Sequence, residues 1–152
     1  MSKKESALIK ILFPLQPDED GYPSVGSERL WGKVVEDGYQ IDNIPFYVTG
    51  VSCCDIVAVN RGNDGTLNFS GVVKRLGHSA IRVCIRDVDA VGKLRRDLKT
   101  LGCESEQDYV PNLIAIDIPP QVKIRPIWEF LEKGLEQGKW EYEDACIQHE
   151  TT

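Results

Sequence analysis

Residues 41–57 read IDNIPFYVTGVSCCDIV, and SERLW occupies residues 27–31 a short way upstream. This run combines a proline, an adjacent Phe and Tyr, a glycine and two adjacent cysteines before an apolar stretch. None of these features is the signature of a catalytic site. The run connects strands predicted at residues 39–41 and 55–60. Because it indicates no activity, candidate functions are ranked from other features of the chain.

The first half of the chain reads as short strands joined by tight turns. The turns at residues 36–38 and 61–65 contain Asp-Gly or Gly and Asn, which tolerate positive φ. A small, strongly bent antiparallel sheet or partial barrel buries such strands best, so we predict a β lobe over residues 1–76. Its strands are expected at residues 7–15, 28–35, 39–41, 55–60 and 66–75.

The second half has the order strand, helix, strand, strand, helix, strand. Ile81, Val83 and Ile85 alternate with polar residues, which predicts a strand with one buried face and Arg82 on the other. The helices are expected from Val88 to Gly102 and from near Pro126 to Gly138, with strands at residues 79–87, 104–109, 113–118 and 140–147. This order predicts a ferredoxin-like split βαβ lobe over residues 77–152, and hence an α+β fold.

The cap of the first helix and the buried face of the second are also predicted. Asp87 is expected to cap the first helix. The second helix is expected to bury Ile127, Phe130, Leu131 and Leu135. We expect the two lobes to pack as one compact unit, since about 150 residues can bury roughly 70% of the unfolded surface.

Composition excludes several classes of function. The net charge is -6 and the pI is near 5.0, whereas a nucleic-acid-binding protein needs a basic face. No apolar run approaches the roughly 20 residues that cross a bilayer. The five cysteines lack the spacing of a zinc site or a disulfide framework. We therefore expect a cytoplasmic protein with reduced thiols, no cofactor, no metal and no contact with nucleic acid or membrane.

A thiol site is the one catalytic possibility that the sequence raises. His78 precedes a strand, and one interpretation is that the fold brings Cys53 and Cys54 close to it as a Cys/His nucleophilic pair. The alternative is a loop histidine bonded to backbone, with the cysteines buried as small hydrophobes. His149, in the polar tail, is expected to be solvated. We favour the non-catalytic interpretation and predict no catalytic residues.

Acidic clusters are the strongest candidates for a binding surface. Most acidic clusters only solubilise a protein. Where carboxylates converge with exposed aromatic side chains, however, they suit fast and tight binding of a basic protein. The residues predicted to contact such a partner are Glu36, Asp37, Trp140, Glu141, Tyr142, Glu143 and Asp144.

Several motifs resemble those of a family of small bacterial proteins of unknown function. They are RLW at residues 29–31, DNIPFY at 42–47, DIV at 55–57 and GHSxxR at 77–82. The resemblance extends from about residue 10 to about residue 142. Small acidic members of such families are often encoded beside toxins, so the resemblance implies an immunity role. It carries no established activity and therefore implies no catalytic residues.

The leading hypothesis is an immunity protein that blocks the active site or substrate groove of a toxin, such as a nuclease. The alternative is a small-molecule sensor or enzyme that uses a cleft between the lobes. That cleft would be lined by Trp31, Phe46, Tyr47, His78 and Arg82. A third interpretation makes the motif residues structural: Arg29 or Arg82 pairs with Asp55, and Trp31 and Phe46 fill the core.

Overall fold

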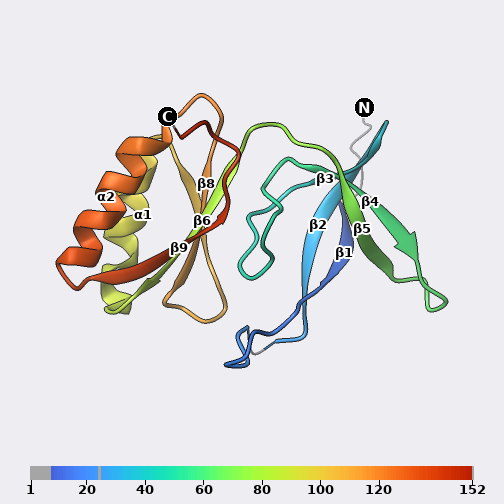
Figure 1. The fold of residues 1–152 in the computed structure, drawn as a ribbon, viewed down its shortest axis with the longest axis horizontal. Coiled ribbons are helices and arrows are strands. Elements are labelled where there is room, and N and C mark those ends of the chain that lie inside the picture. The colour runs from blue at the N-terminus through green and yellow to red at the C-terminus, as the bar shows by residue number, and fades with distance from the viewer. Residues whose placement is uncertain (1–7, 24, 152) are drawn as a thin grey trace. The chain divides into compact units, whose positions relative to one another are not determined.

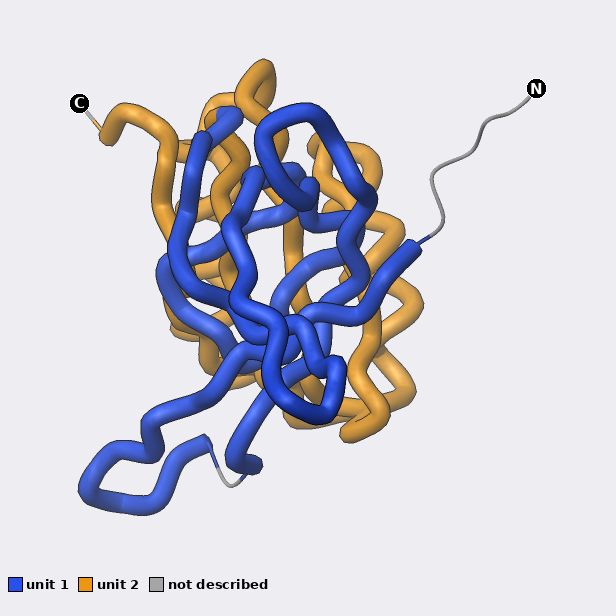
Figure 2. Tube along the Cα trace, turned by 90° about the vertical axis from the view of Figure 1, so that its right-hand side faces the viewer, with its two compact units in different colours: residues 1–76 blue, residues 77–152 orange. Residues whose placement is uncertain are grey.

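A computed structural model describes residues 8–23 and 25–151. The chain divides into two compact units, Met1–Leu76 and Gly77–Thr152 (Figure 2). The first unit is a strongly bent sheet, and the second is a four-stranded sheet with two α-helices. The fold is therefore α+β, and each unit is described by itself below.

The first unit is a closed five-stranded barrel rather than a partial one (Figure 1). Neighbouring strands pair antiparallel, and β1 closes the barrel against β5 through a parallel pairing of Leu12 with Asn68. Two register shifts in the β4–β5 pairing increase the local twist, which helps the sheet to close. The strands are β1 (Leu8–Pro14), β2 (Ser27–Val35), β3 (Gly38–Ile41), β4 (Ile56–Arg61) and β5 (Leu67–Lys74).

Apolar side chains from every strand fill the barrel. Alternate residues of β1, Ile11 and Phe13, are buried, as the period of a strand requires. Phe13 stacks on Phe69 of β5 with ring centroids 4.6 Å apart. The core also includes Leu30, Ile41, Val48, Val51 and Val57. Two of these residues, Val48 and Val51, belong to the connection between β3 and β4, so this connection is part of the core.

The second unit is an antiparallel sheet in the order β7-β8-β6-β9, with both helices on one face (Figure 1). Its strands are β6 (Ser79–Ile85), β7 (Glu104–Gln107), β8 (Leu113–Ile118) and β9 (Trp140–Cys146). Its α-helices are α1 (Val91–Thr100) and α2 (Ile124–Glu136), and a 3₁₀ turn, Val88–Ala90, precedes α1. Asp87 accepts a hydrogen bond from the Asp89 amide and so caps this turn, as predicted. Among the described residues, no helix is both long and apolar enough to span a membrane.

The stripe of α2 that faces the sheet differs from the predicted one. Ile127 and Leu131 are buried as expected, but Leu135 is 38% exposed. The helix begins at Ile124, and its buried stripe ends at Gly134, so Leu135 lies one position beyond the stripe. Phe130 is half-buried and packs against Trp140, with ring centroids 5.6 Å apart.

Gly134 provides a test of this packing. A Cβ atom there would lie 2.0 Å from Cζ2 of Trp140, so α2 approaches the indole more closely than any larger residue allows. We expect Gly134→Ala to lower the free energy of unfolding by about 3 kcal/mol because the ring must move. Urea unfolding followed by tryptophan fluorescence measures this loss.

The matched control is Gly92→Ala in α1. A Cβ atom there meets only the end of the flexible Arg96 side chain, at 3.3 Å. Alanine favours a helix over glycine, so we expect a gain of about 0.5 kcal/mol. Equal effects of the two substitutions would contradict the close approach of α2 to Trp140.

Candidate interaction surface

Strand β9 lies at one edge of the second sheet and pairs with β6 alone in that sheet. Its residues alternate between the two faces, with Tyr142 and Asp144 on the side of α2. Trp140, predicted to contact a partner, is instead a core residue with 6% exposure. Its Nε1–H donates to the Leu131 carbonyl at 2.9 Å, which satisfies the polar end of the ring inside the core.

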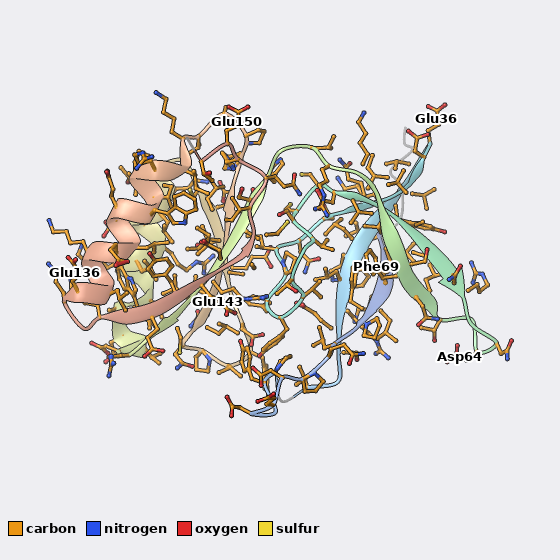
Figure 3. All side chains as sticks on the ribbon, viewed as in Figure 1. Glu36, Asp64, Phe69, Glu136, Glu143 and Glu150 are labelled. Carbon is orange, nitrogen blue, oxygen red and sulfur yellow. The ribbon has the colours of Figure 1, made fainter. Side chains whose placement is uncertain are left out.

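Two hydrogen bonds join β9 to α2 along one side of the helix. Tyr142 Oη donates to Glu132 at 2.8 Å, and Trp128 Nε1 donates to Asp144 at 2.9 Å. Trp128 and Glu132 are four residues apart and therefore lie on one helix face, which Glu136 continues. We name the exposed carboxylates of α2 and β9 at this edge the acidic surface: Glu132, Glu136 and Asp144 on the side of α2, and Glu141 on the opposite face of β9. Figure 3 labels Glu136 at the end of α2.

The pKa of the Tyr142 phenol is raised by burial and by the carboxylates beside it. Burial is the main cause that raises the pKa of Tyr142 to about 12, and the hydrogen bond to Glu132 raises it further. The negative charges of Glu132 and Asp144 act in the same direction. The phenol therefore holds its proton and donates a hydrogen bond to Glu132, with Asp144 as a second carboxylate nearby.

Glu143 has a different role from its neighbours on β9. Arg82 was expected on an exposed face, but it is only 3% exposed, and its Nε donates to Glu143 at 3.0 Å. The two residues are directly opposite each other in the β6–β9 register. A buried guanidinium needs a carboxylate partner, so Glu143 compensates Arg82 and is not part of the acidic surface.

The remaining acidic residues predicted to bind a partner, Glu36 and Asp37, lie in the first unit. They form the exposed turn between β2 and β3, followed by Gly38. Figure 3 labels Glu36 at this turn. The predicted partner-binding set is therefore divided between the two units, and β9 carries most of it.

The predicted ligand-binding set is divided in the same way. Phe46 and Tyr47 are half-buried in the first unit, whereas His78 and Arg82 belong to the second. Trp31 does not fill the barrel core. It is 40% exposed on the outer face of β2, directly opposite Lys10 of β1, and Lys10 Nζ lies 5.0 Å from the centroid of the Trp31 ring.

Asp55 has a partner that the sequence did not indicate. Its side chain is fully buried, and Arg75 Nη1 lies 3.4 Å from Oδ2, so neither Arg29 nor Arg82 is the residue that makes this ion pair. Arg75 follows β5, which pairs with the strand after Asp55, and the sheet pairing thus brings the two together. The carboxylate also accepts a hydrogen bond from the Ser52 amide at 2.9 Å.

Both histidines take part in hydrogen-bond networks of the second unit. His78 Nδ1 lies 2.8 Å from Asp117, whose pKa is raised by burial and held down in part by His78. His149, expected to be solvated, lies 2.6 Å from Ser79 Oγ and 3.0 Å from the Pro119 carbonyl. Ser79 is fully buried, and its hydroxyl also accepts from the Gln148 amide at 2.8 Å, so this serine and histidine anchor the chain after β9.

Glu28 is an important residue that sequence reasoning missed. Its carboxylate accepts hydrogen bonds from the backbone amides of Phe46, Tyr47 and Val48, at 2.7 to 2.9 Å. The partners are main-chain groups, so no pair of side chains in the sequence signals this contact. The bonds tie the long connection between β3 and β4 to strand β2.

The comparisons with known proteins agree with this α+β architecture. Residues 28–142 match the family described as "Domain of unknown function (DUF4265)". The chain belongs to this family, which supports the expected bacterial-type domain of unknown function. No curated protein matches the chain.

A solved structure supports the fold alone. The chain is similar to the "Novel crystal structure of a hypothetical protein from Neisseria gonorrhoeae", with a TM-score of 0.76 and 19% identity. The match covers 95% of this chain and 97% of that chain. The fold is therefore shared over nearly the whole length of both proteins.

Glu132→Gln tests the electrostatics of the acidic surface. In ultraviolet titration we expect Tyr142 to ionise near pH 12, after tyrosines with ordinary values near 10. Neutralising Glu132 should lower this pKa because one negative charge beside the phenolate is removed. Tyr142→Phe, as the control, should remove the late step from the titration curve. A late step unchanged in Glu132→Gln would contradict the contact.

The raised pKa of Tyr142 makes the stability of the fold depend on pH. The unfolded chain releases this proton near pH 10 and the folded chain near 12, so the unfolded state binds fewer protons in between. Stability should therefore fall as pH rises through that interval. Part of the fall should be absent in Tyr142→Phe, as urea midpoints measured across the interval would show.

Glu28→Gln tests the anchor of the connection. The substitution keeps the size of the side chain but removes its charge and turns one acceptor into a donor facing amides. We expect a loss of about 2 kcal/mol, typical of hydrogen bonds to a charged group. Hydrogen exchange should accelerate at the amides of Phe46, Tyr47 and Val48. Glu36→Gln, in an exposed turn, should leave these amides unchanged.

Proposed function

We propose that this protein is a non-enzymatic immunity protein that binds a basic toxin through the acidic surface of its second unit. The observation that carries the proposal is that α2 and the edge strand β9 hold four exposed carboxylates, Glu132, Glu136, Glu141 and Asp144, and that Glu132 and Asp144 lie beside Tyr142. The donors that reach Glu132 and Asp144 are the neutral Tyr142 hydroxyl and Trp128 indole, so no cationic side chain pairs with either carboxylate in these hydrogen bonds. A surface of this kind favours a partner with clustered Lys and Arg.

A nuclease is the kind of toxin that fits this surface best. Its substrate groove must be basic because it binds phosphates. Carboxylates spaced along a strand and a helix offer a similar pattern of negative charge, and Tyr142 adds an aromatic contact. Charge complementarity would accelerate association, and the bound protein would cover the groove. Under this proposal the protein acts in the cytoplasm, without metal or cofactor.

We also propose that the second unit has a ferredoxin-like fold. Its element order and its strand order β7-β8-β6-β9 support a ferredoxin-like arrangement. In this arrangement the last strand lies at an edge, beside the second helix. Such an edge presents strand and helix residues together to a partner.

The direct experiment is co-expression of the tagged protein with catalytically inactive forms of the proteins encoded beside it. Size-exclusion chromatography and mass spectrometry should find one stoichiometric complex. Cells that produce the active form of that partner should survive only when this protein is present. Failure of every neighbour to form a complex, together with no protection, would overturn the proposal.

Charge reversal tests the surface itself. Glu136→Lys combined with Glu141→Lys should slow association with the identified partner by about tenfold or more and weaken its dependence on salt. Both side chains are exposed and lie outside the Tyr142–Glu132 and Trp128–Asp144 contacts, so the fold should persist. Stopped-flow kinetics at several ionic strengths measures both quantities.

The matched control reverses two charges of the first unit, Glu36→Lys with Asp37→Lys. The change in net charge is the same, so a difference between the variants isolates the position of the charges. We expect a small effect in the control. Equal slowing in both double variants would show that net charge alone steers the partner.

A further inference from the structure

Cys53 and Cys54 occupy the central positions of a tight turn in the first unit. The Asp55 amide donates to the Ser52 carbonyl at 3.2 Å and closes the turn. Among residues 8–23 and 25–151, Cys54 alone of the non-glycine residues has a positive φ, at 74°. This position in a turn usually takes glycine, because a side chain there is strained. The turn thus holds a cysteine where the backbone alone would favour glycine.

The two thiols of this turn lie side by side. Their Sγ atoms are 3.7 Å apart, close to van der Waals contact and well beyond the roughly 2.05 Å of a disulfide bond. Both side chains are half-buried, so solutes can reach them. Two adjacent reduced thiols at this distance offer two sulfur ligands to one small thiophilic atom.

The backbone of the turn is held by contacts that do not use the sulfur atoms. The Cys54 amide donates to the Ile41 carbonyl at 2.9 Å, and Gln40 Nε2 donates to the Cys54 carbonyl at 3.2 Å. The buried Asp55 carboxylate accepts from the Ser52 amide and pairs with Arg75. The thiols are therefore positioned before any ligand arrives, which reduces the entropy lost on binding.

We propose that Cys53 and Cys54 form a dithiol site for trivalent organoarsenicals. In the reaction with an arsine oxide, each sulfur forms one bond to arsenic and the arsenic–oxygen bond breaks. The two thiol protons leave with the oxide oxygen as one molecule of water. Arsenic stays trivalent, so the step needs neither oxidant nor reductant.

Geometry favours arsenic over other thiophilic centres. Trivalent arsenic is pyramidal and holds two sulfurs on the same side at close range, as the 3.7 Å separation provides. An ion that prefers two ligands in a line would need the sulfurs on opposite sides. Zinc takes four ligands, and among the described residues no group of three His, Cys, Asp or Glu side chains is placed to hold a metal.

The other cysteines cannot form the same chelate. Cys84 is exposed on β6, where Asn112 Nδ2 lies 3.5 Å from its sulfur, and it serves as a single-thiol control. Cys103 is 1% exposed, and burial raises the pKa of its thiol to about 12. Cys146 is buried in β9. The adjacent pair is therefore the expected point of attachment.

The test is titration of the reduced full chain with phenylarsine oxide, followed by intact-mass spectrometry. We expect one phenylarsenic group per chain, retained in excess monothiol and removed by ethane-1,2-dithiol. Cys53→Ser and Cys54→Ser should each lose retention by at least tenfold in competing monothiol, because only one sulfur remains. Cys84→Ser should bind like the unmodified sequence.

A second measurement keeps the proposal testable if a serine variant fails to fold. Proteolysis of the wild-type adduct should place the arsenic on one peptide that contains both Cys53 and Cys54. Arsenic found on Cys84 or another cysteine, or an adduct that monothiol removes from the unmodified chain, would overturn the proposal. Retention unchanged in both folded serine variants would also overturn it.

Discussion

The carboxylate of Glu28 is the constraint on which the first unit depends. Three consecutive amides, from Phe46 to Val48, converge on it, so one side chain of β2 fixes the start of a long connection. With its position set, the connection inserts Val48 and Val51 into the barrel core and delivers the cysteine turn beside Ile41. The barrel therefore depends on a half-buried charge as well as on apolar packing, because amides left without acceptors at such a site would be costly.

In the second unit, polar side chains inside the fold are satisfied by other side chains. Arg82 and Asp117 lie on its two central strands, and each has a partner of suitable chemistry, Glu143 and His78 respectively. These contacts explain why GHSxxR residues are not surface features: Ser79 and Arg82 are buried, and His78 is half-buried. A motif rich in polar residues can thus be part of a folded interior.

Local signals in the sequence predicted the elements well, but side-chain partners were harder to predict. Strand Leu113–Ile118 occupies the residues that its apolar run indicated, and Asp87 caps as its position before an apolar period suggested. Trp140, Arg82 and His149 were misplaced, since alternation along one strand cannot reveal whether a polar end finds a partner in another element. Barrel closure depends on bulges and on pairing between distant strands, which no local pattern encodes.

Burial and pairing also decide which charges are open to a partner. The net charge of -6 includes Glu28, Asp55 and Glu143, whose carboxylates accept hydrogen bonds within the fold. These groups stabilise local structure, and a partner that bound them would have to break hydrogen bonds within the fold. Glu132 and Asp144 differ because their donors are neutral, so bonding orients them and leaves their charge uncompensated. The argument for a basic partner therefore rests on this small oriented set, and the overall acidity of the chain adds little to it.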